Sequence, residues 1–242
     1  MVSLLLLCWL LPLALASYMM FYMAVGKINS QTERMIVTSA DNALRICEMR
    51  MDAAVEASRN ASYFPTVRES YENFLTDGNL FAFRKTVNLF LERQYCYDDS
   101  FLYTSLLFTG EPQEHFFAAY RGSTSNAVYQ AGRRFEEKVM PGVLEISKEL
   151  DTDVAVVAIE GGVYLIRNLM TTSYHPYAVL TMELNTDVVF GSLDGAWGYE
   201  GSAVYIDGVF LAGDNSGFLE GRPGIGPELF EDNNRECRLI KK

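Results

Sequence analysis

Arg167 is the residue whose type and position point most directly to chemistry, because it stands in an otherwise apolar predicted strand. Over 163–169, strand alternation places Arg167 on one face with Val163, Leu165 and Leu169. A guanidinium among apolar side chains is costly unless it is paired, and a bound carboxylate can pair with it through two parallel hydrogen bonds. Arg167 is therefore a candidate ligand-binding residue, and its replacement by Ala should abolish binding in a folded domain. The alternative is an internal acid, or water reached at the strand end.

Four tyrosines in or beside predicted strands are candidates to line the same pocket. Each offers an aromatic face and a hydroxyl that can orient a small ligand. The chain contains 14 tyrosines, so each of the four is weak support when taken alone. The candidates are Tyr103, Tyr164, Tyr174 and Tyr177.

The residue patterns of catalysis and metal binding do not occur in the sequence. His115 and His175 are the two histidines, and neither has a carboxylate or cysteine partner at ligand spacing. There is no Gly-x-Ser-x-Gly, Walker A or His-Glu-x-x-His pattern. We therefore expect no catalytic residue, no metal and no cofactor.

The net charge narrows the choice of binding partners, and the cysteine content excludes one class of protein. The net charge of −11 disfavours nucleic acid and anionic lipid surfaces. Cys8 falls in the apolar N-terminus, and the remaining Cys47, Cys96 and Cys237 cannot all pair within one chain. The protein is thus not a disulfide scaffold, and the roles of these cysteines stay open.

Strand patterns dominate the chain from residue 100 onward. Tight turns at Gly161-Gly162 and Asp207-Gly208 each separate two strands, which predicts two hairpins. Helices are expected over 124–150, with a break at Pro141-Gly142, and over 187–193. The strands are expected over 101–108, 115–121, 154–159, 163–170, 177–184, 203–206 and 209–212.

The preceding part of the chain is predicted to be helical. Residues 27–60 contain no Gly or Pro and read as one long helix, followed by helices near 66–76 and 79–95. An amphipathic stripe on the long helix packs either on the protein's own domain or on a second copy of the same helix. The stripe consists of Ile36, Ala40, Ala43, Cys47, Met51, Ala54 and Ser58.

The first 26 residues carry no charged side chain, which is the length an α-helix needs to cross a bilayer core of about 30 Å. Ala14-Leu15-Ala16 has the form of a signal peptidase site, so a cleaved secretory signal is the alternative. The apolar run continues to Val25 and no basic residue precedes it, which favours an uncleaved anchor. Lys27 and Arg34 follow the span, and the positive-inside rule alone would place the domain weakly in the cytoplasm.

Three segments carry a resemblance to a known family: 8–12 (CWLLP), 162–169 (GVYLIRNL) and 177–185 (YAVLTMELN). Together with the order of elements, they resemble the input region of bacterial sensor histidine kinases of the YesM type, which has an extracytoplasmic double Cache (PAS-like) domain. The hairpin over 201–214 resembles the opening of a second, membrane-proximal module. The resemblance covers nearly the whole chain.

The resemblance implies an α+β fold in which a transmembrane helix continues into a stalk helix. A PAS-like (Cache) antiparallel sheet flanked by helices would follow, and then a second, incomplete Cache module. The implied domains are a transmembrane helix over 1–26, a stalk over 27–62, a membrane-distal sensor module over 63–193 and the start of a membrane-proximal module over 194–242.

The resemblance also implies a function and a location. The domain would lie outside the cell membrane, bind a small molecule, and pass the signal through the N-terminal helix of a homodimer formed by the stalk. Histidine kinase activity is expected only in a C-terminal part that this sequence lacks, so the chain is expected to be a fragment or a truncated product. The alternatives are the input domain of a chemoreceptor or diguanylate cyclase, or a membrane-anchored surface scaffold or binding protein.

Overall fold

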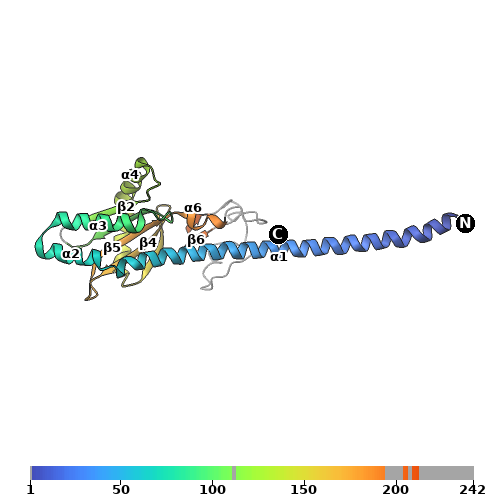
Figure 1. The fold of residues 1–242 in the computed structure, drawn as a ribbon, viewed down its shortest axis with the longest axis horizontal. Helices are drawn as coiled ribbons and strands as arrows, with labels where there is room; N and C mark the ends of the chain where they lie inside the picture. Colours follow the sequence, from blue (N-terminus) through green and yellow to red (C-terminus); the bar gives the residue numbers. More distant parts are fainter. Residues whose placement is uncertain (1, 111–112, 194–203, 207–208, 213–242) are drawn as a thin grey trace.

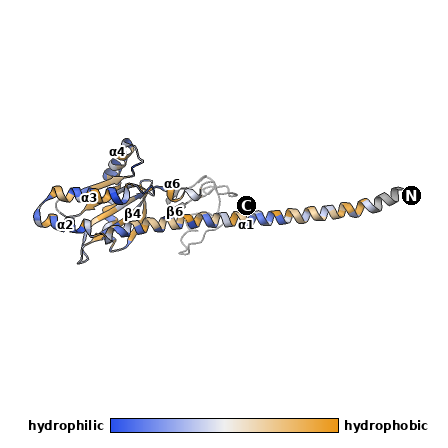
Figure 2. Ribbon diagram, viewed as in Figure 1, coloured by the Kyte–Doolittle hydropathy of each residue, from blue (hydrophilic) through white to orange (hydrophobic). Residues whose placement is uncertain are grey.

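The computed structural model describes residues 2–110, 113–193, 204–206 and 209–212. It begins with one continuous helix, α1 (Val2–Tyr63), which joins the predicted span and stalk without interruption (Figure 1). The large apolar side chains from Trp9 to Val25 are exposed, and Figure 2 shows this end of α1 as mainly hydrophobic. By length and composition, α1 can therefore span a membrane.

The helices α2 (Pro65–Asp77) and α3 (Leu80–Tyr95) confirm the predicted pair divided at Asp77-Gly78. Gly78 ends α2 in the left-handed conformation with φ 66°, and its N–H donates to the carbonyl of Phe74. Asn79 then caps α3, because its side chain accepts a 3.1 Å hydrogen bond from the N–H of Ala82. These two residues reverse the chain between α2 and α3.

One antiparallel sheet of five strands, in the order β2-β1-β5-β4-β3, forms the centre of the fold. The strands confirm the predicted ones to within two residues at each end, and the α+β class is confirmed with them. The sheet pairs strands from distant parts of the sequence, since β1 lies between β2 and β5. The strands are β1 (Phe101–Phe108), β2 (His115–Ala119), β3 (Val154–Ile159), β4 (Gly162–Met170) and β5 (Pro176–Leu184).

The turn between β3 and β4 lies one residue earlier than predicted. Glu160 and Gly161 form it with φ values of 49° and 79°, as a tight two-residue hairpin loop requires. Gly162 is instead the first residue of β4, where a Cβ atom would come within 2.8 Å of the Tyr164 ring. The absence of a side chain at Gly162 therefore makes room for Tyr164.

The predicted break at Pro141-Gly142 is wrong. The chain stays helical through α4 (Ser125–Arg134), a π-helical turn η1 (Phe135–Val139) and α5 (Met140–Glu149). Pro141 falls in the first turn of α5, where a missing N–H is tolerated, and the wider π turn directly precedes it. The irregularity thus takes the form of a change in winding just before the proline.

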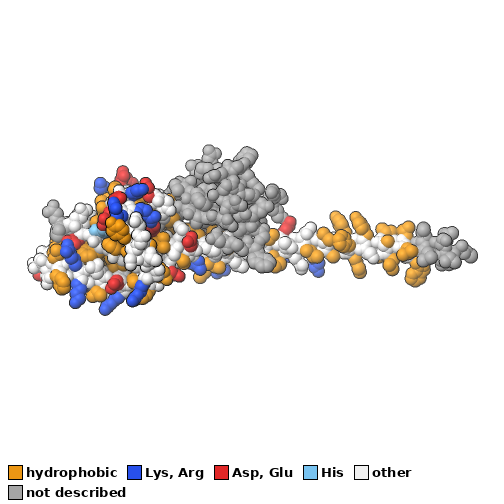
Figure 3. All heavy atoms as spheres, turned by 90° about the horizontal axis from the view of Figure 1, so that it is seen from above, with side chains coloured by type: hydrophobic (Ala, Val, Ile, Leu, Met, Phe, Trp, Pro, Cys, Tyr) orange, Lys and Arg blue, Asp and Glu red, His pale blue; other side chains and the backbone are white. Residues whose placement is uncertain are grey.

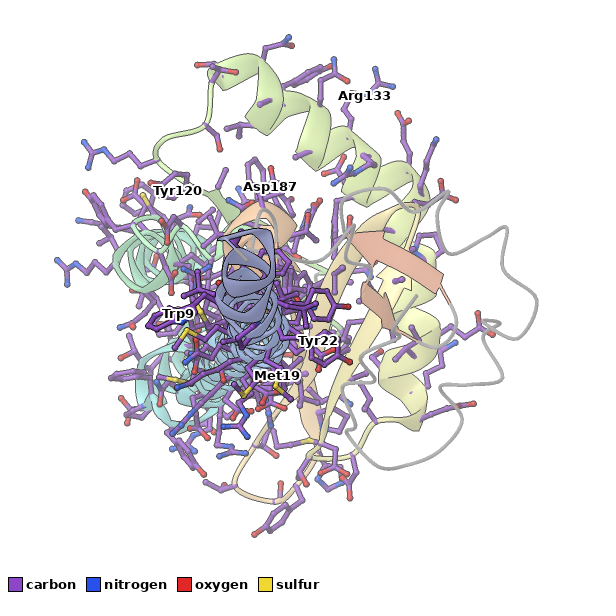
Figure 4. All side chains as sticks on the ribbon, turned by 90° about the vertical axis from the view of Figure 1, so that its right-hand side faces the viewer. Trp9, Met19, Tyr22, Tyr120, Arg133 and Asp187 are labelled. Carbon is purple, nitrogen blue, oxygen red and sulfur yellow. The ribbon has the colours of Figure 1, made fainter. Side chains whose placement is uncertain are left out.

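Helices cover both faces of the sheet. α1, α2 and α3 pack on the face that carries Leu165 and Leu180, and η1 and α5 pack on the face that carries Tyr164 and Ile166. Figure 4, which looks along α1, shows the strands between α1 and α5, with α4 beyond one edge. β4 and β5 are consequently buried on both faces.

The amphipathic stripe of α1 packs on the protein's own domain from Ala43 onward. Ala43, Cys47, Ala54 and Ser58 are all at most 5% exposed, whereas Ile36 and Ala40 are half-buried. Small side chains at these positions let α1 lie close to β4 and to the segment that follows the sheet. Of the two predicted uses of the stripe, this part serves the domain core.

The segment after β5 continues with α6 (Thr186–Val189) and a 3-10 turn η2 (Gly191–Leu193), close to the predicted helix over 187–193. β6 (Val204–Ile206) and β7 (Val209–Ala212) pair antiparallel and confirm the second predicted hairpin. Its predicted turn at Asp207-Gly208, the rest of the predicted second module and Cys237 lie outside the described residues.

Adjacent alanines in α1 provide a test of this packing. Ala54→Leu should lower the free energy of unfolding by about 1–3 kcal/mol, because Ala54 is 2% exposed and the added atoms must displace core side chains. Ala53→Leu, on the exposed side of the same helix turn, should change it by less than about 0.5 kcal/mol. Thermal unfolding of both variants measures the difference, and equal midpoints would contradict the packing of α1.

Candidate functional site

Arg167 is bonded inside the protein. It lies on the sheet face covered by α1, is 6% exposed, and donates hydrogen bonds to Ser58 Oγ at 3.1 Å and to the Thr152 carbonyl at 2.9 Å. Burial lowers the pKa of Arg167 from its ordinary value, and neighbouring Arg59 adds to the effect. The predicted face is correct. Ser58 and Thr152 are partners inside the protein, but neither is the acidic residue that the sequence suggested as an alternative to a ligand.

The four candidate tyrosines do not come together around Arg167. Tyr103 and Tyr164 belong to the opposite face of the sheet, in the cluster formed with η1 and α5. Tyr177 stacks on Tyr71 of α2, with ring centroids 5.4 Å apart, and Tyr174 is 77% exposed in the turn before β5. The five predicted residues therefore do not form one pocket.

A cavity of about 560 Å³ lies between α4 and the sheet, at the edge where β1 and β2 meet. Part of its wall is apolar, formed by small and aliphatic side chains that include Leu102, Val128 and Ala131. Arg133, Arg134 and Lys138 line it from the helical side, and Glu183 lines it from β5. An apolar wall with a few polar groups is the usual composition of a small-molecule site.

An ion pair between Arg134 and Glu183 joins the helical wall of the cavity to the sheet. The Glu183 side chain is 4% exposed and accepts a hydrogen bond from Nη2 of Arg134, whose side chain is 39% exposed. Burial lowers the pKa of Arg134, but the bond to Glu183 and its charge raise it, with a net increase. A carboxylate so deeply buried requires this partner, because an unpaired charge there is costly.

Two tyrosine hydroxyls lie behind this ion pair. Tyr164 is beside Glu183 and Arg134, and Tyr103 is near Glu183 and Tyr164. Burial is the main cause that raises the pKa of both phenols far above the ordinary value, and Glu183 adds to it. Both hydroxyls are therefore neutral groups that can donate a hydrogen bond. Tyr103 and Tyr164 thus lie behind the ion pair in the cavity wall, and neither lines the cavity itself.

Several buried polar atoms around the cavity have no hydrogen-bond partner among the described residues. Nε of Arg134 and the hydroxyl of Tyr103 are both in this group. An unsatisfied buried donor costs about 1–3 kcal/mol. A group that accepted a hydrogen bond from one of these atoms would remove that cost, which favours its binding. Such atoms are uncommon in folded proteins, and a bound water or ion is one of the partners that can satisfy them.

His115 lies at the start of β2, beside the π-helical turn that follows Arg134. Its ring stacks on Phe135, with centroids 5.3 Å apart and an interplanar angle of 17°, and its Nδ1 is 3.5 Å from Glu136 Oε1. Burial lowers the pKa of His115 below its ordinary value of 6.5, and Glu136 opposes the shift. Neutral His115 is therefore part of the packing that holds η1 on the sheet.

Glu183 and Arg134 were not among the residues predicted from the sequence, although one signal for Glu183 was available. Strand alternation along β5 places Glu183 on one face with Val179 and Thr181, the same argument that identified Arg167 on β4. Arg134 has no such signal, because it lies near the end of an exposed, charged helix. Within the described residues, no group of three or more His, Cys, Asp or Glu side chains is placed to hold a metal ion.

Comparisons with known proteins add no assignment to this geometry. No protein-family model matches the chain, and no curated protein matches it either.

Protonation of His115 predicts a pH-dependent stability. His115 has a lower pKa in the folded chain than its ordinary value of 6.5, so below pH 6.5 the unfolded chain binds more protons at this residue than the folded chain does. The contribution of His115 to stability is therefore fully present above pH 6.5 and falls as the pH drops below it. His115→Phe, which keeps the stacking on Phe135, should reduce this fall. Unfolding midpoints at several pH values test it, with exposed His175→Gln as the matched control. An unchanged pH dependence in His115→Phe would contradict the role of His115.

The ion pair in the cavity predicts different results at two adjacent arginines. Arg134→Ala should destabilise the fold by about 1–3 kcal/mol, because it leaves the Glu183 carboxylate buried without its partner. Arg133→Ala should cost less than about 0.5 kcal/mol, since its partner Glu137 is exposed. Denaturant titration compares the two variants, and an equal loss would show that Glu183 does not depend on Arg134.

Proposed function

We propose that the chain is the ligand-sensing part of a membrane receptor, and that the ligand binds in the cavity between α4 and the sheet. The observation that carries the proposal is the Arg134–Glu183 ion pair, which is built into the wall of that cavity beside unpartnered buried donors. The cavity and α1 lie on opposite sides of the same sheet. A binding event at one face can therefore act on the helix at the other through β4 and β5.

The proposed class of receptor is the one suggested by the sequence, a sensor histidine kinase with an extracytoplasmic Cache (PAS-like) input region. An antiparallel sheet with helices on both faces, entered from a long N-terminal helix, is compatible with that resemblance. We propose that the apolar end of α1 spans the cell membrane and that the domain lies outside the cell. The kinase would belong to another part of the receptor, and an input region of a chemoreceptor or diguanylate cyclase remains the alternative.

The contact between Arg167 and Ser58 provides a physical link from the sheet to α1. Tyr164, beside Glu183, and Arg167, bonded to Ser58, are three residues apart on β4 and lie on its two faces. We propose that a ligand which shifts Glu183 and Tyr164 also shifts β4, and thereby α1. This assigns Arg167 to signal transfer in place of ligand contact.

We also propose that the chain forms a homodimer through α1, but through a different face of α1 from the predicted amphipathic stripe. From Ala43 to Ser58 the original stripe is used by the domain itself, so a second copy must meet another face of α1. Exposed apolar side chains are present on α1 below and beside the domain, among them Ile28, Met35 and Met49.

The proposed site is tested with the full chain in lipid nanodiscs. Sugars, amino acids and carboxylates are screened by thermal shift, and the affinity of each hit is then measured by calorimetry. Ala127→Trp, which adds a large ring to the cavity wall, should lower the affinity at least tenfold, because the new side chain occupies the ligand's space. Ala53→Trp, on the exposed face of α1, is the matched control.

Arg167 distinguishes this site from the one predicted from the sequence alone. Arg167→Ala should leave the affinity of a hit within about twofold and lower the midpoint of unfolding, since its partners are internal. Loss of binding in a folded Arg167→Ala protein, together with unchanged binding in Ala127→Trp, would reject the cavity as the ligand site.

A further inference from the structure

Arg134 presents an unused charged donor beside the cavity. Its Nη2 is bonded to Glu183, Tyr164 lies beside it, and its Nε is buried without an acceptor among the described residues. The Arg134 side chain is nevertheless 39% exposed and lines the cavity, so part of it can meet a ligand. A guanidinium offers donors in a fixed fork, and a second acceptor beside Glu183 would complete its hydrogen bonding. The group that fits an unfilled cationic donor is a hydrogen-bond acceptor, and best an anionic one.

The charges around the cavity favour the same class of ligand. Both acidic side chains in the wall are already bonded to arginines, Glu183 to Arg134 and Glu137 to Arg133. The remaining cation in the wall, Lys138, forms an exposed ion pair with Glu160 at 3.9 Å, and an exposed pair of this kind contributes little enough that a ligand carboxylate can compete with it. Figure 3, which looks down onto α4, shows basic side chains beside acidic and apolar ones on this face.

The apolar part of the wall defines the rest of the ligand. Leu102 and Ala119 lie on the sheet side, and Ala127, Val128 and Ala131 lie on the α4 side. None of these side chains can form a hydrogen bond, so the polar contacts of the wall come from its charged residues and from Ser123 and Gln130. A ligand with a compact apolar body and one anionic end would bury the body between them.

We propose that the cavity binds a small organic carboxylate, with its carboxylate on Arg134 and Lys138 and its apolar body between Leu102 and Val128. This inference rests on the proposed function, because it assigns a ligand class to the same cavity. It excludes amines as ligands, since the carboxylates that would receive an ammonium are already paired. It also disfavours neutral amides of the same shape, which cannot form charge-assisted bonds.

The experiment compares three probes of one shape: benzoate, benzamide and benzylamine. Binding to the full chain in nanodiscs is followed by ¹⁹F NMR of a fluorine label at Tyr129→Cys, an exposed position of α4 that lies beside the cavity wall without lining it. Cys8, Cys47, Cys96 and Cys237 are replaced by Ser, after unfolding has verified that the fold is kept. Benzoate should shift the signal and bind about tenfold or more tightly than benzamide, and benzylamine should produce no saturable shift. The preference for benzoate should weaken as salt is raised.

Variants identify the groups that hold the carboxylate. The double variant Arg134→Gln/Glu183→Gln removes both charges together, so that no carboxylate is left buried alone, and should lose the preference for benzoate over benzamide. Lys138→Gln should weaken benzoate binding severalfold and leave benzamide binding unchanged. Arg59→Gln, at a half-buried arginine of α1 that pairs with Glu56 and does not line the cavity, is the control and should change neither.

The outcomes separate the ligand class from the site. If benzamide or benzylamine shifts the label as strongly as benzoate, the carboxylate assignment is overturned, whereas the cavity stays a binding site. If hits from the screen bind, but neither these hits nor the three probes shift the label at position 129, both the site and the ligand class are overturned. A benzoate preference that survives in Arg134→Gln/Glu183→Gln would also overturn the assignment.

Discussion

Burial of β4 and β5 on both faces is the constraint on which the rest of this structure depends. A strand with one face in water can carry polar side chains there at no cost, but these two strands have no such face. A charged or amide side chain on them is therefore stable only with a partner inside the protein. Arg167 bonds to Ser58 and Thr152 on one side, while Asn168 donates to the Ser147 carbonyl at 2.8 Å on the other, and Glu183 bonds to Arg134.

Apart from the Thr152 carbonyl, these internal partners belong to helices and not to the sheet. Ser58 lies on α1, Ser147 on α5 and Arg134 at the end of α4, so the three strand residues bonded to them each fix one helix against the sheet. Arg134 differs from the other partners, because its side chain is 39% exposed and also lines the cavity. Of the three helix–sheet contacts described, the one between Arg134 of α4 and Glu183 of β5 is thus the contact that a small molecule in the cavity can reach.

Local patterns predicted the elements of this fold well. Gly78 and Asn79 turn the chain through their own backbone and side-chain preferences, and the alternation of 163–169 places Arg167 on the correct face. The partners of these residues were not predictable in the same way. Ser58 is 109 residues away from Arg167, and Arg134 is 49 residues away from Glu183. No periodicity in a single sequence reports which distant segments meet, so the predicted site combined residues that the sheet places on opposite faces.

The stripe on α1 shows the same limit, and its outcome bears on how a signal would travel. Small residues at three- and four-residue spacing suit either a partner helix or a sheet, and from Ala43 to Ser58 they pack on the domain. That packing joins the domain to α1 over about four turns, and the helix continues without a break to the apolar segment. From Ser58 to Val25 the rise is about 50 Å. Because no glycine or proline interrupts α1 below Ser58 until Gly26, a displacement of Ser58 by β4 is carried along the helix as a rigid-body movement, and does not end in a local bend.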